Sequence, residues 1–133
     1  MIYLDSSVAL QAILETPDRQ TLLSWFAANT EPLVSSRLLR TETIRILWRE
    51  HRSASDADWL LARVNLVDIT RQTHDLAESF TGNIRTLDAL HVATALTLAS
   101  PLLSGRLTLA SHDQQMLAIA AAEGIDTIDP VVA

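Results

Sequence analysis

The chain has 133 residues, of which 48% are hydrophobic, and it carries a formal net charge of −6. This length suits one domain with a sizeable core, and the composition excludes a disordered or low-complexity chain. Because the chain has no cysteine, a disulfide framework and a thiolate zinc site are both excluded. The acidic balance argues against a protein that coats DNA through many phosphate contacts, although a nucleic-acid enzyme with a local basic surface stays possible.

Two apolar stretches bear on where the protein acts. The first, Met1 to Leu4, has no basic segment and stops at Asp5, so we expect no signal peptide. The longest, at residues 87–103, is interrupted by Asp88 and His91 and suits a core helix better than a membrane span. We therefore expect a soluble, cytoplasmic protein with no membrane association.

The predicted elements alternate between short β-prone runs and longer helical segments. Strands are predicted at residues 2–4, 32–34, 66–69, 107–109 and 126–128. Helices are predicted at residues 8–15, 17–29, 36–51, 72–80, 86–99 and 116–123, with a capped turn at 53–58 before Trp59 and with Gly124 ending the last helix. This alternation predicts an α/β fold, an α/β/α sandwich with a short, mostly parallel sheet. No linker divides the chain, so we expect a single domain over residues 1–133.

The helix that begins near Thr86 is apolar on nearly every face, which is typical of a buried helix. Its first turn nevertheless carries Asp88, and His91 lies one turn later on the same side. A charge that enters a buried helix needs a partner, a cap or a metal. Taken alone, these residues favour a plain interpretation, in which Thr86 caps the helix and Asp88 complements its dipole.

Three further acids fall close to predicted strand ends or helix starts. Asp5 ends the first strand, Asp113 follows the strand at 107–109, and Glu42 lies in the helix after the second strand. The functional crevice of a parallel sheet lies beyond the carboxyl ends of its strands, so we expect these acids and Asp88 to meet there.

Each of these acids also has a structural explanation. Asp5 could cap the next helix, and Asp113 lies within a possible capping box formed by Ser111 and Gln114. Glu42 could pair with the arginines three and seven residues further along its helix.

Considered together, the four acids predict a cation site, which none of them predicts alone. Carboxylates gathered in one cleft repel one another, and a cation would resolve that repulsion. Oxygen ligands without cysteine favour Mg²⁺ or Mn²⁺. Such an ion can receive a phosphate oxygen and activate a water, which makes phosphodiester hydrolysis the reaction that this set of residues suits best.

Four segments resemble the motifs of PIN-domain ribonucleases: Leu4-Asp5-Ser6-Ser7, the run from Ser36 to Glu42, the run from Arg85 to His91, and Ser111-His112-Asp113. The small size of the chain resembles the VapC toxins of bacterial toxin–antitoxin pairs. The resemblance implies a Mg²⁺- or Mn²⁺-dependent endoribonuclease, neutralised by a cognate VapB-type antitoxin, in a homodimer and a higher toxin–antitoxin complex. It implies that the catalytic, metal-binding acids are Asp5, Glu42, Asp88 and Asp113.

Two positions depart from the family pattern. Ser111 stands where the family often has threonine and keeps the hydroxyl, so we place it with Ser7 and His91 among the supporting residues. His112 stands where some relatives carry an additional acid, which leaves the number of metal ions open. His51, His74 and His112 lack the spacing of a metal pair and are expected at the surface.

All ten basic residues are arginines. Arg45 and Arg49 share a stripe with Arg52 on the helix of Glu42, and we predict that this stripe and Arg85 bind the RNA backbone. A solvated face paired with neighbouring acids is the alternative. Four aromatic residues in the early helices are expected mainly in the core, although a groove there could receive an antitoxin helix; they are Trp25, Phe26, Trp48 and Trp59.

Two other functions are weighed against the nuclease. A catalytically silent PIN-like scaffold that binds RNA or a protein is the alternative, and the presence of all four acids argues against it. A receiver-type phosphoacceptor domain would need a lysine near its site, and the chain has none.

Overall fold

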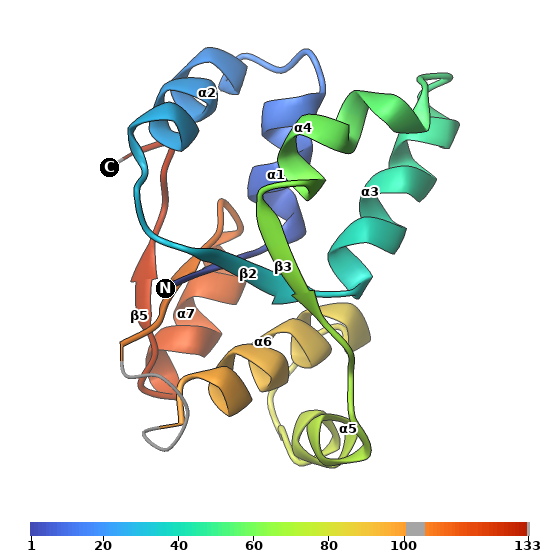
Figure 1. Ribbon diagram of the computed structural model, residues 1–133. Coiled ribbons are helices and arrows are strands. Elements are labelled where there is room, and N and C mark those ends of the chain that lie inside the picture. The colour runs from blue at the N-terminus through green and yellow to red at the C-terminus, as the bar shows by residue number, and fades with distance from the viewer. Residues whose placement is uncertain (101–105, 133) are drawn as a thin grey trace.

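Figure 1 shows the computed structural model, which describes residues 1–100 and 106–132. A five-stranded sheet lies at its centre, and all of the pairings between neighbouring strands are parallel. The strand order is β3-β2-β1-β4-β5. The strands are β1 (Ile2–Leu4), β2 (Leu33–Ser36), β3 (Val64–Val67), β4 (Thr108–Ala110) and β5 (Asp126–Ile128).

Helices cover both faces of the sheet, which confirms the predicted α/β/α sandwich (Figure 1). One face packs against α1 (Ser6–Ile13), α2 (Arg19–Ala28), α3 (Leu38–Arg49), the 3₁₀ turn η1 (Ala54–Ala57) and α4 (Asp58–Leu61). The other face packs against α6 (Thr86–Leu98) and α7 (Gln114–Ala122). The remaining helix, α5 (Arg71–Glu78), packs against α6.

The central strand β1 shows why this short sheet has two cores. Successive side chains of a strand point to opposite faces. Ile2 and Leu4 accordingly join the core formed with α1, α2 and α3, whereas Tyr3 joins the core formed with α6 and α7. Tyr3 and Leu4 are completely buried, so β1 is in contact with both helical layers.

The strand order places a topological switch point beside β1. The chain runs outward from β1 through β2 to β3, and then returns to place β4 on the other side of β1. Ligands of open α/β sheets bind in the crevice outside the carboxyl ends of the strands at such a point. Asp5 follows β1 and Ser111 follows β4, so both residues lie at this crevice.

Several predicted boundaries are corrected. Ser35 and Ser36 are the last residues of β2, because β2 continues its ladder with β3 as far as Val67. That ladder also begins β3 at Val64, before the predicted residue 66. The cap of η1 is Ser53, whose hydroxyl accepts a hydrogen bond from Ser55 N–H. The end of α7 agrees with prediction, since Gly124 has a φ of +85°, which glycine adopts readily.

The most apolar helix, α6, is buried over seven consecutive residues from Ala89 to Ala95. In the described residues, no helix has both the length and the apolar character needed to cross a membrane. The apolar stretch predicted at 87–103 ends with residues 101–103, which lie outside the described residues.

The aromatic residues divide between core and surface. Phe26 is buried, and the rings of Trp25 and Trp59 meet it edge-on at centroid distances of 5.0 and 5.7 Å. Trp59 is nevertheless 37% exposed, so its expected place in the core is wrong, and the same holds for Trp48, which is 62% exposed on α3. It lies on the outward side of α3, opposite Leu39 and Leu47, which take the core positions.

We predict that Thr43→Val raises the free energy of unfolding by about 1 kcal/mol. Thr43 is fully buried on α3, and its hydroxyl has no hydrogen-bond partner within the described residues. A buried polar group without a partner costs about 1–3 kcal/mol, and valine removes it with little change of shape. Urea denaturation followed by circular dichroism measures the effect.

Thr94→Val is the matched control. Thr94 is also buried, but its hydroxyl donates to Leu90 O at 2.7 Å. This variant should lose stability, so equal losses in both variants would contradict the prediction for Thr43.

Candidate active site

A cleft of about 400 Å³ opens at the switch point of the sheet. All four acids predicted to act together line it, and they come from segments far apart in the sequence: the end of β1, α3, the first turn of α6 and the start of α7. The remaining lining residues are Ser6, Ser7, Leu10, Arg85, Thr86 and Leu87. A larger hollow of about 480 Å³ lies beside α7, but Glu123 is the one acid among its lining residues.

Asp5 is buried and is held by two serine hydroxyls. Ser7 Oγ and Ser111 Oγ each donate to Asp5 Oδ2 at 2.8 Å. Each serine also accepts a backbone N–H from the loop after β4, Ser7 from His112 at 2.9 Å and Ser111 from Asp113 at 3.0 Å. Both hydrogen bonds to Asp5 fall on one oxygen, and in the described chain Oδ1 accepts none.

The capping explanation for Asp5 is wrong. Asp5 occupies the N-cap position of α1, but its side chain makes no capping hydrogen bond. The backbone carbonyl of Asp5 accepts the N–H of Val8 at 3.2 Å instead. The carboxylate therefore caps no backbone N–H of α1, and its contact with that helix is the hydroxyl of Ser7.

Asp113 is the cap of α7. Its Oδ1 accepts N–H groups from Gln115 at 2.9 Å and Met116 at 3.3 Å. The predicted capping box of Ser111 and Gln114 is therefore wrong, because Ser111 bonds to Asp5 and to the backbone of Asp113 instead. Capping fixes the position of the Asp113 carboxylate at the positive end of the α7 dipole.

Asp88 lies in the first turn of α6, and Arg85 rather than Thr86 takes the N-cap position without a side-chain cap. The predicted cap by Thr86 is therefore wrong. Burial raises the pKa of the Asp88 carboxyl, and the charges of Asp5 and Asp113 raise it further, against the opposing effects of Arg85 and His91. Arg85 Nε lies 3.6 Å from Asp88 Oδ2. The repulsion expected among the cleft acids is thus present at Asp88.

Glu42 reaches the cleft from α3 and pairs with a histidine. His91 Nε2 lies 2.6 Å from Glu42 Oε1, and Ser6 Oγ donates to Glu42 Oε2 at 3.1 Å. The suggested pairing of Glu42 with Arg45 and Arg49 is wrong, because in the described chain neither arginine forms an ion pair with it.

His91 is completely buried, as expected of a core residue. Burial by itself would lower the pKa of His91. The hydrogen bond and charge of Glu42, with the charges of Asp5 and Asp88, outweigh burial and raise the pKa. Tyr3 Oη lies 2.7 Å from His91 Nδ1, and burial raises the pKa of Tyr3 as well.

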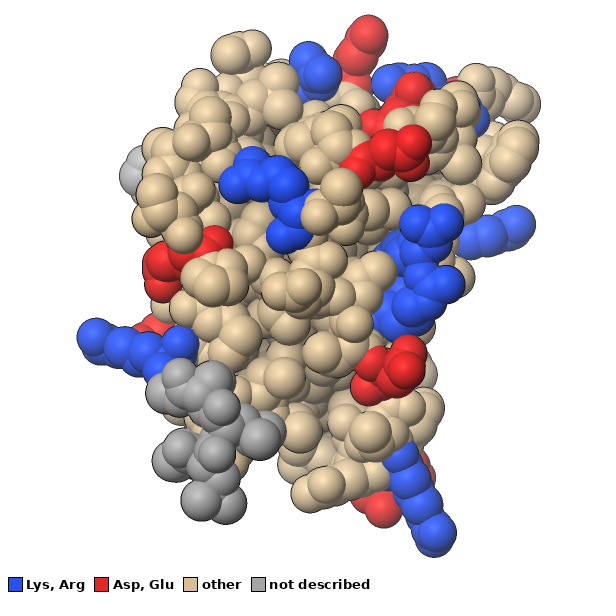
Figure 2. Space-filling model, viewed as in Figure 1, with Lys and Arg blue, Asp and Glu red and all other residues tan. Residues whose placement is uncertain are grey.

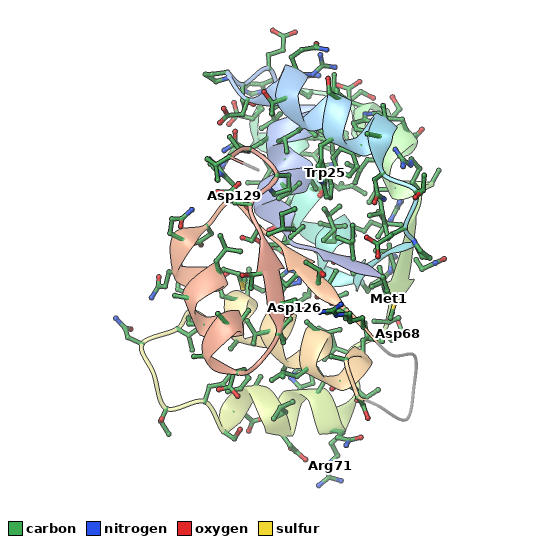
Figure 3. The ribbon with its side chains drawn as sticks, turned by 90° about the vertical axis from the view of Figure 1, so that its left-hand side faces the viewer. Met1, Trp25, Asp68, Arg71, Asp126 and Asp129 are labelled. Carbon is green, nitrogen blue, oxygen red and sulfur yellow. The ribbon has the colours of Figure 1, made fainter. Side chains whose placement is uncertain are left out.

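Sequence reasoning missed a second histidine–carboxylate pair beside the cleft. His112 Nδ1 lies 3.0 Å from Asp129 Oδ2, and Gln114 Nε2 donates to the same oxygen at 3.1 Å. His112 was expected at the surface, but it is only 28% exposed, and its Nε2 lies 3.7 Å from Asp18 at the start of α2. Figure 3 shows Asp126 and Asp129 at the two ends of β5. No local spacing links residue 112 with residue 129, so only the fold shows this pair.

The predicted RNA-binding arginines are exposed. Arg45 and Arg49 project from α3, and Arg85 lies at the mouth of the cleft. Figure 2 shows basic side chains gathered on the right-hand side of the molecule, over α3. Part of the stripe is paired, since Arg49 lies 3.8 Å from Glu50, and Arg52 lies 2.9 Å from Asp56.

The chemistry of the cleft suits a hard cation. It offers carboxylate oxygens, and the charges of Asp5 and Asp113 add to the effect of burial in raising the pKa of Asp88. In the described part of the chain, however, no three acidic or histidine side chains converge tightly enough to form a ready-made metal site. The donors therefore fit a cation by type and charge, without a closed coordination shell.

Comparison with known proteins decides the family. The sequence profile described as PIN domain matches residues 2–122. The chain belongs to the PIN-domain family. Within that family it is 35% identical to Ribonuclease VapC46 of Mycobacterium tuberculosis over 131 residues, 97% of each protein.

Solved PIN-domain structures share the fold. A toxin–antitoxin complex from Klebsiella pneumoniae contains a chain that superposes with a TM-score of 0.74 at 13% identity, over 98% of each chain. The sarcin–ricin loop cleaving toxin VapC20 of Mycobacterium tuberculosis superposes with a TM-score of 0.71 at 16% identity, over 90% of this chain and 95% of that one. These likenesses support the PIN fold of the described residues.

We predict that Asp88→Asn stabilises the metal-free protein at neutral pH. The folded-state pKa of Asp88 is raised, so the folded protein binds more protons than the unfolded chain between the ordinary aspartate pKa of 3.8 and the raised pKa. The free energy of unfolding therefore falls as pH rises through that window, and above the window the whole destabilisation caused by ionising Asp88 is present. Asparagine removes this cost, and thermal unfolding in a chelator across a pH series measures it.

The advantage of Asp88→Asn should vanish below the unfolded pKa, where Asp88 is protonated in both states. Asp68→Asn changes an exposed acid outside the cleft and serves as the control, with little expected effect. An Asp88 variant less stable than the parent at neutral pH would contradict the prediction.

Proposed function

We propose that this protein is the toxin of a type II toxin–antitoxin system, a Mg²⁺- or Mn²⁺-dependent endoribonuclease that hydrolyses RNA phosphodiester bonds. The observation that carries the proposal is the meeting of Asp5, Glu42, Asp88 and Asp113 in one cleft at the switch point. The relative that is 35% identical over 97% of the chain is named a ribonuclease, which supports the same activity here. The chain would act as a single domain over residues 1–133 in the cytoplasm.

The four acids would hold the metal ion. When bound, Mg²⁺ or Mn²⁺ stabilises charge on a phosphate oxygen and lowers the pKa of a water, which makes a nucleophile available at neutral pH. The protein's own contribution is orientation. Ser7 and Ser111 fix Asp5 through Oδ2, and Oδ1 accepts no hydrogen bond within the described residues, while His91 supports Glu42.

RNA would approach over α3. Arg45 and Arg49 lie three and seven residues beyond Glu42 on that helix, so they extend from the cleft in one direction. Arg85 lines the cleft itself and can meet a phosphate close to the acids. The negative total charge does not oppose this, because the local field of these arginines can guide the RNA backbone towards the cleft.

A cognate VapB-type antitoxin is the proposed partner, in a complex built on a homodimer of this chain. One structural neighbour is a toxin–antitoxin complex, which is consistent with such an assembly. The partner would act by covering the cleft or its approach.

We predict that the protein cleaves RNA with added Mg²⁺ or Mn²⁺ and loses this activity with a chelator. Asp5→Asn should reduce the cleavage rate by more than the roughly 10- to 100-fold typical of changes around a metal site, because it removes a charge at the centre of the cleft. Gel-resolved cleavage of total RNA measures the rate.

Unchanged thermal unfolding of Asp5→Asn, and full activity of the control Asp68→Asn, would assign the loss to the cleft. If the parent binds RNA but does not cleave it with either metal, the catalytically silent scaffold is the better assignment. The open arrangement of the acids in the described residues is the observation that favours that alternative.

We predict that Arg49→Glu weakens RNA binding and flattens its salt dependence. Each lost phosphate contact lowers the slope of log affinity against log salt by about 1. Filter binding of the catalytically weakened Asp5→Asn protein, with and without the second change, measures this over a salt series.

Arg106→Glu makes the same charge change just before the amino end of β4, away from the cleft at the carboxyl ends of the strands, and should leave the slope unchanged. If Arg49→Glu leaves the slope of log affinity against log salt unchanged, RNA does not bind along α3 and this part of the proposal is wrong.

A further inference from the structure

A buried hydrogen-bonded chain leads from the core of the protein to the cleft. Tyr3 is completely buried on β1, and its hydroxyl lies 2.7 Å from His91 Nδ1. The other ring nitrogen of His91 lies 2.6 Å from Glu42 Oε1. Three elements, β1, α6 and α3, therefore meet through the side chains of these residues.

The chemistry of the partners fixes which group donates the hydrogen bond between His91 and Glu42. An ionised carboxylate can only accept hydrogen bonds, so the proton between His91 and Glu42 is carried by His91 Nε2. The Tyr3 hydroxyl accepts the backbone N–H of Ser36 at 3.2 Å, which anchors it at the end of β2. Rotating the imidazole by half a turn would break its contacts with Tyr3 and Glu42 together.

The ring of Tyr3 also packs against the imidazole ring of His91. The two rings meet edge-on, with centroids 5.8 Å apart and an angle of 74° between their planes. His91 has no exposed surface, so its ring nitrogens have no access to water as an alternative partner. A polar group in such a place depends on its protein partners for its orientation.

The consequence for Glu42 is a carboxylate with a hydrogen-bond partner on each of its two oxygens. Oε1 is held by His91, and Oε2 accepts the hydroxyl of Ser6, which itself lines the cleft. Glu42 is a long side chain that is still 19% exposed. Without the histidine it could adopt several rotamers at the cleft wall.

We propose that Tyr3 is a positioning residue of the cleft, which acts through His91 to fix the Glu42 carboxylate for metal binding. This inference rests on the proposed function. A hydrophobic strand position facing α6 could be filled by phenylalanine, and the hydroxyl adds polar contacts with His91 and Ser36 N–H and with the side chains of Ser35 and Thr94. The hydroxyl is therefore the part of Tyr3 that serves the site.

The test compares Tyr3→Phe with the parent protein by titrating Mn²⁺ alone into the full chain and following free Mn²⁺ by electron paramagnetic resonance. Changes that disturb the orientation of metal ligands lower affinity by about 10- to 100-fold. Tyr3 acts through one further residue, so we expect a loss of roughly tenfold, the lower end of that range.

Thr97→Val is the matched control. It also removes one hydroxyl, and Thr97 Oγ1 donates to Ala93 O within α6 at 3.0 Å, towards the end of the helix away from Asp88. We expect its Mn²⁺ affinity to equal that of the parent. Equal losses in Thr97→Val and Tyr3→Phe would reflect general loosening of α6 and would overturn the proposal.

A second measurement follows the histidine itself. Long-range ¹H–¹⁵N spectra of the metal-free protein report both ring nitrogens of His91, and Tyr3→Phe should shift Nδ1 and speed exchange of the Nε2 proton with solvent. His91→Gln, which can keep an N–H near the position of Nε2, should retain more Mn²⁺ affinity than His91→Leu. Unchanged His91 signals with unchanged Mn²⁺ affinity in Tyr3→Phe would overturn the proposal.

The two proposals fail in different ways. A parent protein that binds Mn²⁺ and cleaves no RNA would contradict the nuclease function, while the affinity of Tyr3→Phe would still decide the role of Tyr3. A parent that cleaves RNA, with a Tyr3→Phe variant of equal Mn²⁺ affinity, would leave the nuclease and remove Tyr3 from the site.

Discussion

Mutual repulsion among carboxylates in one small cleft is the constraint on which the site is built. Each acid is held in place by a different device. Asp5 is held by hydroxyl groups, Asp113 by the free N–H groups of α7, and Glu42 by the buried imidazole of His91. Among the described residues, an exposed arginine lies beside Asp88, and burial followed by the charges of Asp5 and Asp113 raises the pKa of the Asp88 carboxyl. At this acid the repulsion within the cluster therefore adds to the cost of burial.

The parts of the fold that follow from local patterns were predictable from the sequence. β1 and β5 occur at the predicted residues, because short apolar runs that end at an acid or a turn have few other interpretations. The gathering of acids was also predictable, since the carboxyl ends of parallel strands share one edge. Asp5 shows this well: its position directly after a β-prone run was sufficient to place it at the cleft.

The partners of those acids could not be predicted. Glu42 and His91 are 49 residues apart, and the spacing along α3 suggested Arg45 and Arg49 instead. Local spacing identifies neighbours on one helix but carries no information about which side chain another helix brings across the core. The same limit explains why Trp48 was expected in the core, since the pattern of a short amphipathic helix does not fix which aromatic side chains face outward.

The contact between Ser7 and Ser111 joins positions 104 residues apart, at the two ends of the chain. Ser7 is close to Asp5 in the sequence, but Ser111 is synthesised long after it, so the support from Ser111 cannot form until β4 and the loop that follows it are present. A growing chain on the ribosome would therefore carry Asp5 before the cleft is assembled. The order of synthesis itself delays activity until β4 and the loop that follows it have emerged.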